Sequence, residues 1–364
     1  MSDLQFGRGR GSQQQSEQEV FKIQRAVRQR VPQIMCIYGP TFSGKTFGAF
    51  LVAAGLVEPG GKIGLLDSEN KRGSAYADDP DIMKVIPQGF DIIDLAPPFH
   101  PRRYIGGIRT FENAGFDLAI IDSGSHAWDG EGGAQDIKEK EKGWAGAKMW
   151  SKRLKNAIIY SQMHIIVCLR AQNKVKIVEE YDQRGNKKQK YIPLGMQPIC
   201  EATLPFDLGV SIRVEGMVDG QPATHLAYPE KYPKGMGWLF DNWNPQLLTP
   251  DIGRRIREWN DGGSAMDPAE LLQKQARNAA EQGVEEYAKF YLGLPNAKKK
   301  VLSDTTHNEN KEIAKRVDEA TAYAEATEPA GFKQPSDGAE LTEEEMQRDM
   351  LAALKREQER ESKS

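Results

Sequence analysis

The chain has 364 residues and a net charge of −3, and its 39% hydrophobic and 28% charged residues are the proportions of a soluble protein with a core of its own. No run approaches the roughly 20 apolar residues of a membrane span, and the N-terminus lacks a signal-peptide core, so we expect a cytoplasmic protein without membrane contact. Its three cysteines stand singly, which excludes a CxxC metal site and favours reduced thiols in a core.

Short apolar runs alternate with helical runs in the first half of the chain. Residues 1–16 are rich in Gly, Gln, Ser and Arg, and we expect them to be a disordered tail. The pattern then predicts strand 34–38, helix 45–55, strands 62–67 and 90–95, helix 102–114, strand 117–122, helix 144–161 and strand 164–169. Strands separated by helices indicate right-handed crossovers, so this order predicts an α/β domain with a parallel central sheet covered on both faces.

From residue 170 to residue 240 the pattern changes to hairpins. The segments NKVKIVEEY and KKQKYIPLG flank a DQRGN turn, and a second hairpin is expected around Asp219-Gly220. We therefore expect antiparallel strands that extend the parallel sheet.

The remaining residues favour helices. Thr249-Pro250 and Asp267-Pro268 are typical helix starts. The segment DGGSA, 261–265, marks the expected boundary between a core of residues 17–260 and an acidic, helical and partly disordered appendage, 261–364. A last predicted helix starts at Thr342, and its apolar stripe is typical of a packing or partner face. The stripe consists of Met346, Met350 and Leu354.

The segment GPTFSGKT, from Gly39 to Thr46, fits the phosphate-loop pattern G-x-x-x-x-G-K-[ST] between an expected strand and an expected helix. Gly39 and Gly44 allow backbone conformations that turn N–H groups toward phosphate oxygens. The ammonium group of Lys45 reaches the β and γ phosphates, and the Thr46 hydroxyl group binds Mg²⁺. The predicted nucleotide-binding residues are Gly39, Pro40, Thr41, Phe42, Ser43, Gly44, Lys45, Thr46 and Phe47.

Polar residues at the ends of three other strands are expected at the same edge of the sheet. Asp122 ends the apolar run FDLAIID, where its carboxylate can hold a Mg²⁺-bound water. Glu69 ends KIGLLDSE and could serve as general base or be a solvated loop residue. Arg170 and Gln172 follow strand 164–169, and either could bond the γ phosphate or simply meet water.

Two other classes of nucleotide-binding protein fit the sequence less well. The segment that starts at Asn173 begins like the guanine-reading NKxD but ends in Lys176, which cannot accept the guanine N–H groups. The DSGS that starts at Asp122 does not give the D-x-x-G of a GTPase switch. A small-molecule kinase needs an arginine-rich lid, whereas the segment after Asp122 has mixed charge and several glycines. ATP, together with Mg²⁺, is therefore the expected ligand.

The order GPTFSGKT, LLDSE, LAIIDS and IIVCLRAQ resembles that of the RecA-like ATPase core, and the likeness spans about residues 33–240. The chain is similar to phage-encoded AAA/RecA-like nucleotide-binding proteins, among them short RecA-type single-strand annealing proteins. The resemblance implies a RecA-like P-loop NTPase fold that hydrolyses ATP. It also implies that Glu69 is the general base, that Asp122 holds Mg²⁺, and that Arg170 or Gln172 senses the γ phosphate.

The resemblance further implies two loops that line a channel for single-stranded DNA. The first loop covers residues 124–143, with His126 and Trp128 as possible base-stacking groups. The second covers residues 174–191, where cationic and aromatic side chains could follow a phosphate backbone, although exposed hairpins are often lysine-rich for solubility alone. Its candidate residues are Lys174, Lys176, Arg184, Lys187, Lys188, Lys190 and Tyr191.

RecA-like proteins assemble into rings or filaments, so the resemblance implies a homo-oligomer in which a neighbouring subunit completes each site with a cation. Lys231 and Lys234, in YPEKYPKG, stand where such lysines are found, but ordinary loop lysines fit equally well. The chain departs from RecA in its appendage and in the absence of an evident long N-terminal oligomerisation helix.

Together these observations predict a Mg-ATP-dependent ATPase that acts on single-stranded DNA in phage recombination, by single-strand annealing, or in replication, within the host cytoplasm. The alternative is a nucleotide-switched interaction module or accessory loader with little turnover. In that case the C-terminal helices would dock a recombination or replication partner.

Overall fold

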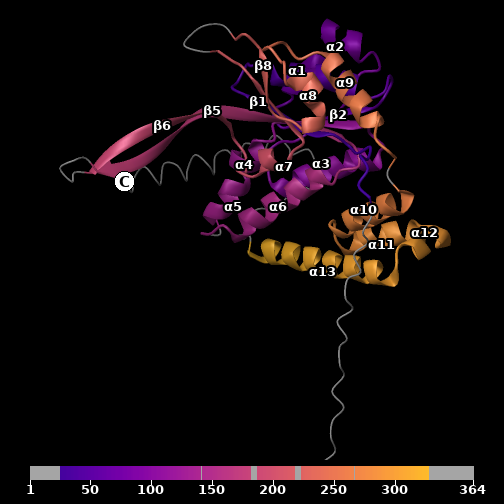
Figure 1. Ribbon diagram of the computed structural model, residues 1–364. Helices are drawn as coiled ribbons and strands as arrows, with labels where there is room; N and C mark the ends of the chain where they lie inside the picture. Colours follow the sequence, from indigo (N-terminus) through magenta and orange to yellow (C-terminus); the bar gives the residue numbers. More distant parts are fainter. Residues whose placement is uncertain (1–24, 141, 182–186, 218–222, 266, 328–364) are drawn as a thin grey trace, which may run out of the picture.

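The computed structural model describes residues 25–140, 142–181, 187–217, 223–265 and 267–327, with the backbone alone at 178–181, 187–190 and 323–327. A sheet with helices against it, a two-stranded ribbon that projects from the sheet, and a group of C-terminal helices make up the described chain (Figure 1). The predicted tail 1–16, the turn at Asp219-Gly220 and the predicted helix from Thr342 lie outside the described residues.

Among the described residues, eight strands form one sheet in the order β3-β2-β4-β5-β1-β7-β8, with β6 paired to β5. The strands are β1 (Ile34–Gly39), β2 (Ile63–Asp67), β3 (Asp91–Asp94), β4 (Leu118–Asp122), β5 (His164–Tyr181), β6 (Lys187–Pro198), β7 (Val210–Val214) and β8 (Ala227–Lys231). Pairing from β3 through β7 is parallel, whereas β6 and β8 run antiparallel to their partners. The predicted α/β class, the mainly parallel sheet and the antiparallel extensions are confirmed.

Helices connect and cover these strands. They are α1 (Lys45–Leu56), α2 (Pro80–Val85), α3 (Pro101–Asn113), α4 (His126–Asp129), α5 (Ala134–Lys140), α6 (Ala145–Ile159), α7 (Leu204–Asp207), α8 (Gly237–Phe240), α9 (Pro250–Asp261), α10 (Pro268–Ala280), α11 (Val284–Gly293), α12 (Asn296–Val301) and α13 (Asp304–Thr327), with 3₁₀ turns η1 (Arg72–Tyr76) and η2 (Lys234–Met236). None of the helices in the described part of the chain combines the length and the apolar composition needed to cross a membrane.

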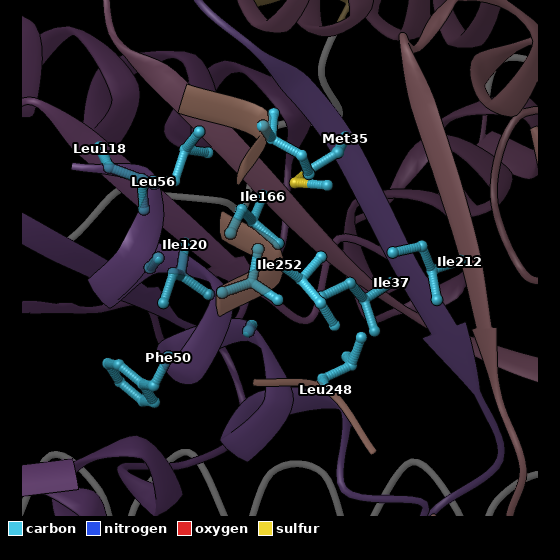
Figure 2. Close-up of a cluster of buried hydrophobic side chains, with 14 of the residues drawn as sticks. Met35, Ile37, Phe50, Leu56, Leu118, Ile120, Ile166, Ile212, Leu248 and Ile252 are labelled. Carbon is cyan, nitrogen blue, oxygen red and sulfur yellow. The ribbon is translucent and has the colours of Figure 1, made fainter. Parts of the chain in front are cut away.

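The sheet is buried on both faces because successive side chains of a strand point to opposite sides. Along β4, Leu118 and Ile120 belong to one core cluster, and Ala119 and Ile121 belong to another. The first cluster includes side chains of α1 and α9, which Figure 2 shows packed around Ile120 and Ile166. The second includes side chains of α3 and α6. The apolar runs that predicted parallel strands are therefore buried between two helical layers.

Helices α1 and α9 pack closely because glycine occupies the contact. A Cβ atom added to Gly253 of α9 would lie 2.0 Å from the backbone oxygen of Val52 in α1. Real Cβ atoms do not approach an oxygen so closely, so any side chain at this position would force the helices apart. The C-terminal end of the predicted core is thereby joined to α1, the helix that follows the segment 39–46.

Strand β5 is much longer than the predicted strand 164–169. Its first part lies between β1 and β4, and the rest continues to Tyr181 as a ribbon with β6 that projects from the sheet (Figure 1). The prediction treated residues 170–181 as the arm of a separate hairpin, because the apolar run stops at Leu169. The backbone pairing continues past that point because β6 supplies hydrogen bonds after the parallel neighbours end.

The C-terminal helices α10 to α13 have a small core of their own. Its members include Leu272, Ala276, Tyr287 and Leu302. Helix α10 begins after Asp267, whose side chain accepts a hydrogen bond from the backbone N–H of Ala269, as the helix-start pattern predicted. The guanidinium group of Arg153 on α6 bonds to Thr321 and to the backbone of Val317 on α13, which links this helical part to the sheet domain.

Candidate functional site

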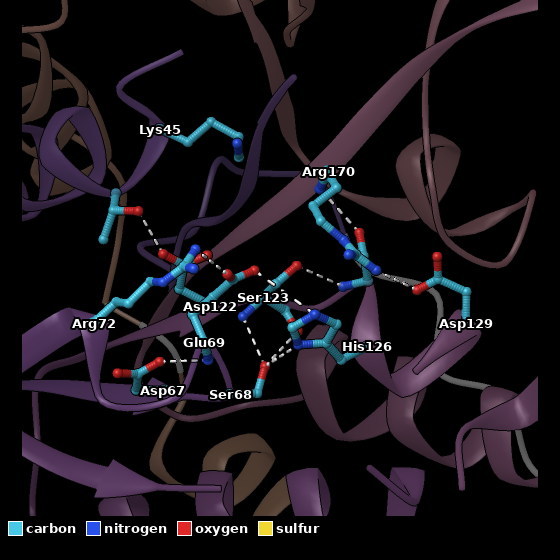
Figure 3. Close-up of polar contacts among 12 residues, drawn as sticks. Lys45, Asp67, Ser68, Glu69, Arg72, Asp122, Ser123, His126, Asp129 and Arg170 are labelled. Atoms are coloured by element: carbon cyan, nitrogen blue, oxygen red, sulfur yellow. Dashed lines mark hydrogen bonds and ion pairs between the residues drawn. The ribbon is translucent and has the colours of Figure 1, made fainter. Parts of the chain in front are cut away.

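The predicted phosphate-binding and acidic residues come together at one edge of the sheet because β1, β2 and β4 are parallel and end at the same level, where β5 passes them at Arg170. Asp67 at the end of β2 is opposite Asp122 at the end of β4, and Gly39 at the end of β1 is opposite Arg170 of β5. Adjacent parallel strands therefore carry the phosphate-loop segment, two acidic strand ends and a cation to one place (Figure 3).

The segment 39–46 forms the turn between β1 and α1. Phe42 and Gly44 have positive φ angles of 61° and 82°, a region that favours glycine and that lets consecutive N–H groups point inward. Helix α1 starts at Lys45 with no side-chain cap and no acidic residue in its first turn. The helix start therefore carries N–H groups and a positive dipole end without an acidic residue of its own, which suits an anion.

Lys45 lies in this turn with its side chain largely buried. It is 9% exposed, and its ammonium group donates a hydrogen bond to the backbone oxygen of Pro40 at 2.9 Å. Burial lowers the pKa of Lys45, and the carboxylates of Asp122 and Glu69 oppose that shift, whereas Arg170 adds to it. A buried ammonium with its charge incompletely balanced favours a bound anion.

Thr46 and Asp122 contact each other directly. The Thr46 hydroxyl group donates to Oδ2 of Asp122 at 2.5 Å. Burial raises the pKa of Asp122 to about 6, and the hydrogen bond from Thr46 and the charge of Lys45 oppose the rise. A hydroxyl and a carboxylate oxygen are ligands that Mg²⁺ accepts, and it commonly takes only one or two protein ligands beside phosphates and waters. The pair fits such an ion, although the described residues contain no cluster of three or more acidic, His or Cys groups of metal-site geometry.

Two buried polar atoms beside the loop lack a hydrogen-bond partner. They are Oγ of Ser43, a residue that is 0% exposed, and Nε of Arg170. Buried polar groups are almost always bonded in folded proteins, so both atoms have capacity for an acceptor such as a phosphate oxygen. These two unpartnered atoms show that the residues around segment 39–46 fit a bound anion.

The turn after β2 orients Glu69. Asp67 is 2% exposed, and its carboxylate accepts the backbone N–H groups of Glu69 at 2.6 Å and Gly73 at 2.8 Å. The Glu69 carboxylate lies 3.8 Å from Nε2 of His126 and 3.6 Å from the guanidinium group of Arg72. Its side chain is 24% exposed, so the group has access to water at the sheet edge.

Ser68 and Ser123 join the ends of β2 and β4. The Ser68 hydroxyl group accepts the N–H of Ser123 at 2.9 Å, donates to the backbone oxygen of Ser123 at 3.1 Å and lies 2.9 Å from Nδ1 of His126. The Tyr104 hydroxyl group also donates to that Ser123 oxygen. The peptide bond between Asp122 and Ser123 is cis. These contacts hold Glu69 and Asp122 in a constant relation to each other.

Arg170 is held by residues of the segment that follows β4, on the side away from Lys45 (Figure 3). Its backbone N–H donates to the Ser125 hydroxyl group at 2.9 Å, and its guanidinium NH2 donates to Asp129 at 2.8 Å. Gln172, the other sensor candidate, is exposed on β5 and pairs with Gln197 of β6. The structure therefore brings Arg170 to the cluster, and Gln172 stays outside it.

The two aromatic residues of the first predicted DNA loop, His126 and Trp128, lie in different environments. His126 faces the site, with a side chain that is 14% exposed and a ring that stacks on Phe99 at 4.8 Å, so it is not presented to the surface as a base-stacking group. Trp128 stacks on Trp144 with 6.0 Å between the ring centroids, and the ammonium group of Lys138 lies 4.6 Å from the centroid of the Trp144 ring. Trp144 is 41% exposed, so this pair is accessible.

The second predicted DNA loop is the β5–β6 ribbon. Lys174 and Lys176 are exposed on β5, and Tyr191 is 63% exposed on β6. Arg184 lies outside the described residues, and only the backbone is described at Lys187, Lys188 and Lys190. An accessible ribbon with lysines agrees with either predicted role of this segment, nucleic-acid contact or solubility.

The two candidate trans-acting lysines lie apart from the cluster. Lys231 pairs with Ser211 near the start of β7, and its ammonium group donates to the backbone oxygens of Phe206 and Leu208, the latter at 2.6 Å. Lys234 is exposed at the start of η2. Their predicted action on the site of a neighbouring subunit stays a prediction.

Sequence reasoning missed Tyr76 and Ser68. Burial raises the pKa of Tyr76, and a hydrogen bond with Thr46 opposes the shift, so the phenol lies beside the Thr46–Asp122 pair. Its ring packs against Phe50 at 5.4 Å and Phe47 at 6.4 Å. A tyrosine in a loop belongs to no motif, and only the path of η1 brings it back to α1. Ser68 was visible beside Glu69, but nothing in the sequence indicated that it bonds across to β4.

Comparison with protein-family models gives no match, and comparison with curated protein sequences also gives none.

Proposed function

We propose that this chain is a P-loop ATPase with a RecA-like core, which binds Mg-ATP and hydrolyses it when single-stranded DNA is bound. The observation that carries the proposal is the contact between the Thr46 hydroxyl group and the Asp122 carboxylate beside the buried ammonium group of Lys45. A helix N-terminus, a buried cation and a magnesium-type ligand pair in one turn are the parts that triphosphate binding requires.

The phosphate-binding groups follow from the geometry of the turn. The N–H groups at the start of α1, the ammonium group of Lys45 and the hydroxyl group of Ser43 would bind phosphate oxygens. Mg²⁺, when bound, neutralises charge that develops between the β and γ phosphates. Thr46 and Asp122 would hold that ion, and the close contact between them would open to admit it. The Ser68–Ser123 contacts keep the Asp122 backbone in place during this change.

Hydrolysis also needs a group that orients water and a group that acts on the γ phosphate. Glu69 suits the first role because its carboxylate is partly exposed and fixed by the turn that Asp67 organises. Arg170 suits the second because its buried Nε atom lacks a partner and its charge acts on Lys45. This assignment selects Arg170 over Gln172 as the sensor.

Binding of single-stranded DNA is supported by two exposed features. The Trp128–Trp144 stack with Lys138 combines aromatic faces and a cation, and Lys174 and Lys176 follow one strand of the ribbon. Aromatic stacking with phosphate-tracking cations is the usual mode of sequence-tolerant single-strand binding. We propose a role in phage recombination, by annealing, or in replication, carried out by a ring or filament in which Lys231 or Lys234 acts across subunits.

The test is ATP turnover by the full chain with and without an oligothymidylate, combined with light scattering to measure assembly. We expect turnover that rises with DNA and that Lys45→Ala abolishes. As a matched control, Lys62→Ala removes a lysine at the opposite end of β2 and should leave turnover unchanged. Failure of the full chain to bind ATP, or turnover that survives Lys45→Ala, would contradict the proposal.

A second candidate function is a nucleotide-switched interaction module. The supporting observation is a cavity of about 230 Å³ between α11 and α13 with an apolar lining that includes Tyr287, Tyr291 and Leu292, and with Lys311 and Lys315 beside it. Such a groove suits an acidic amphipathic partner helix. Tight ATP binding with negligible turnover, together with loss of partner capture in Leu292→Asp, would favour this candidate over the ATPase.

A further inference from the structure

Helix α4 is a single turn that lies beside both residues proposed to act in hydrolysis, Glu69 and Arg170. Its first residue, His126, lies 3.8 Å from the Glu69 carboxylate, and its last residue, Asp129, bonds to the Arg170 guanidinium group at 2.8 Å. The buried Ala127 between them packs in the core. In Figure 3, His126 lies beside Glu69, and Asp129 lies on the far side of Arg170 from Lys45.

The same turn carries an accessible aromatic surface. Trp128 stands between Ala127 and Asp129 and stacks on Trp144, which is 41% exposed. A ligand that inserts between the two rings must move Trp128 or Trp144, and α4 has only four residues through which a movement of Trp128 can be absorbed. A displacement of Trp128 would therefore shift its neighbour Asp129 and His126, two positions away.

Asp129 fixes the orientation of the Arg170 guanidinium group. Asp129 binds NH2 of the guanidinium group, the Ser125 hydroxyl group binds the backbone N–H, and Nε stays buried without a partner. Fixing one end of a planar guanidinium group sets where its remaining N–H groups point. A small rotation of α4 thus changes whether Nε can meet a phosphate oxygen.

His126 lies beside Glu69 at a longer distance, with 3.8 Å between Nε2 and the carboxylate, and is itself held in place on two sides. Its Nδ1 lies 2.9 Å from the Ser68 hydroxyl group, its ring stacks on Phe99, and its Nε2 faces the Glu69 carboxylate. Ser68 itself bonds to Ser123, the residue after the proposed Mg²⁺ ligand. The imidazole therefore limits the positions that the Glu69 side chain can take while leaving its carboxylate in contact with water.

From these contacts we propose that α4 couples single-stranded DNA on the Trp128–Trp144 pair to ATP hydrolysis, with Asp129 and His126 as positioning residues for Arg170 and Glu69. The inference rests on the proposed ATPase function and names the regulation of that site. It assigns neither residue a contact with ATP.

The experiment measures steady-state ATP hydrolysis by the full chain with and without oligothymidylate, and measures binding of a fluorescent ATP analogue separately. Asp129→Asn removes the charge that anchors Arg170, so we expect kcat with DNA to fall about tenfold or more while the KM for ATP and the analogue Kd change less than about threefold. Asp129→Glu keeps the charge and should restore part of kcat. A purely structural role would change binding and thermal unfolding together with kcat.

His126→Ala should produce the same separation of kcat from KM, and His126→Asn, which keeps a polar atom near Ser68, should recover part of the loss. Trp128→Ala should bring the ratio of DNA-stimulated to unstimulated turnover close to one. The control Trp238→Ala removes a tryptophan that is 52% exposed on α8 and should keep that ratio. The control Asp251→Asn breaks the ion pair with Arg254 on α9 and should keep kcat.

Two kinds of failure are distinguishable. If Asp129→Asn and His126→Ala retain the kcat and the stimulation ratio of the unsubstituted chain while Lys45→Ala abolishes turnover, the coupling role of α4 is wrong and the ATPase proposal stands. If the unsubstituted chain binds and hydrolyses no ATP, both proposals are wrong.

Discussion

The hydroxyl group of Thr46 and the carboxylate of Asp122 lie 2.5 Å apart although 76 positions separate them in the sequence. Thr46 belongs to the first turn of α1, and Asp122 ends β4, a strand that is separated from β1 by β5. The contact therefore depends on α1, which packs across β5 and reaches β4. It places a hydroxyl and a carboxylate oxygen, the ligand types that Mg²⁺ accepts, beside Lys45.

The first prediction concerns Asp122. In the Asp122→Asn variant we expect the Kd for a fluorescent ATP analogue in Mg²⁺ to increase about tenfold or more, because a neutral amide holds the ion less well than a carboxylate. In EDTA the variant and the unsubstituted chain should bind the analogue equally. An equal loss of affinity in Mg²⁺ and in EDTA would mean that Asp122 contributes to the fold of the loop and holds no metal ion.

A second prediction separates binding from hydrolysis at Glu69. Glu69→Gln keeps the shape and the backbone contact with Asp67 but removes the base, so we expect kcat to fall about 10²-fold or more with the ATP Kd nearly unchanged. Glu258→Gln, on the exposed side of α9, is a control for loss of one carboxylate. Turnover that survives in Glu69→Gln would remove Glu69 from the general-base role.

A third prediction uses two helical glycines with opposite surroundings. Gly253→Ala places a Cβ atom 2.0 Å from the Val52 backbone oxygen, so we expect the free energy of unfolding to fall by about 1–3 kcal/mol. Gly106→Ala, in α3, meets nothing within 4 Å and should raise it by about 0.5–1 kcal/mol, since alanine loses less conformational entropy in a helix. Denaturant unfolding measures both changes. Equal effects of the two substitutions would contradict the close packing of α1 and α9.

A fourth prediction concerns pH and His164. Burial lowers the pKa of His164 to about 4, and its Nδ1 accepts the N–H of Gln33 at 2.8 Å. Between pH 6.5 and 4 the unfolded chain binds this proton and the folded chain does not, so the His164 contribution to stability decreases as pH falls through that window. At pH 5 the loss should be about 1–2 kcal/mol.

The measurement for this prediction is the difference between two pH profiles. Denaturant unfolding of the unsubstituted chain and of His164→Gln from pH 7.5 to pH 4.5 cancels the other titrating groups, including Asp122, whose raised pKa acts in the opposite direction. His164→Gln should lose less stability on acidification. Parallel profiles would show that His164 titrates equally in the folded and unfolded chains.

The local sequence pattern was sufficient to predict those elements whose position depends on one simple physical requirement. The apolar run of β4 and the helix start at Thr249-Pro250 were predicted within a residue or two of their positions, because burial on both faces and proline geometry each leave a sequence signature. The length of β5 was not predicted, because its outer half is stabilised by pairing with β6 and has no buried apolar run.

The candidate site also contains some features that the sequence predicted and others that only the tertiary structure decided. The sequence by itself located the segment 39–46 between a strand and a helix, Asp122 at the end of β4 and Glu69 two residues past the end of β2, since each combines a residue type with a fixed place in a strand–loop–helix unit. Only the tertiary structure decided that Arg170 lies in the cluster while Gln172 lies outside, that His126 faces Glu69, and that Asp129 anchors the Arg170 side chain. These contacts join loops whose strands are neighbours in space, and strand order and side-chain direction at a sheet edge are properties of the whole fold that no local pattern encodes.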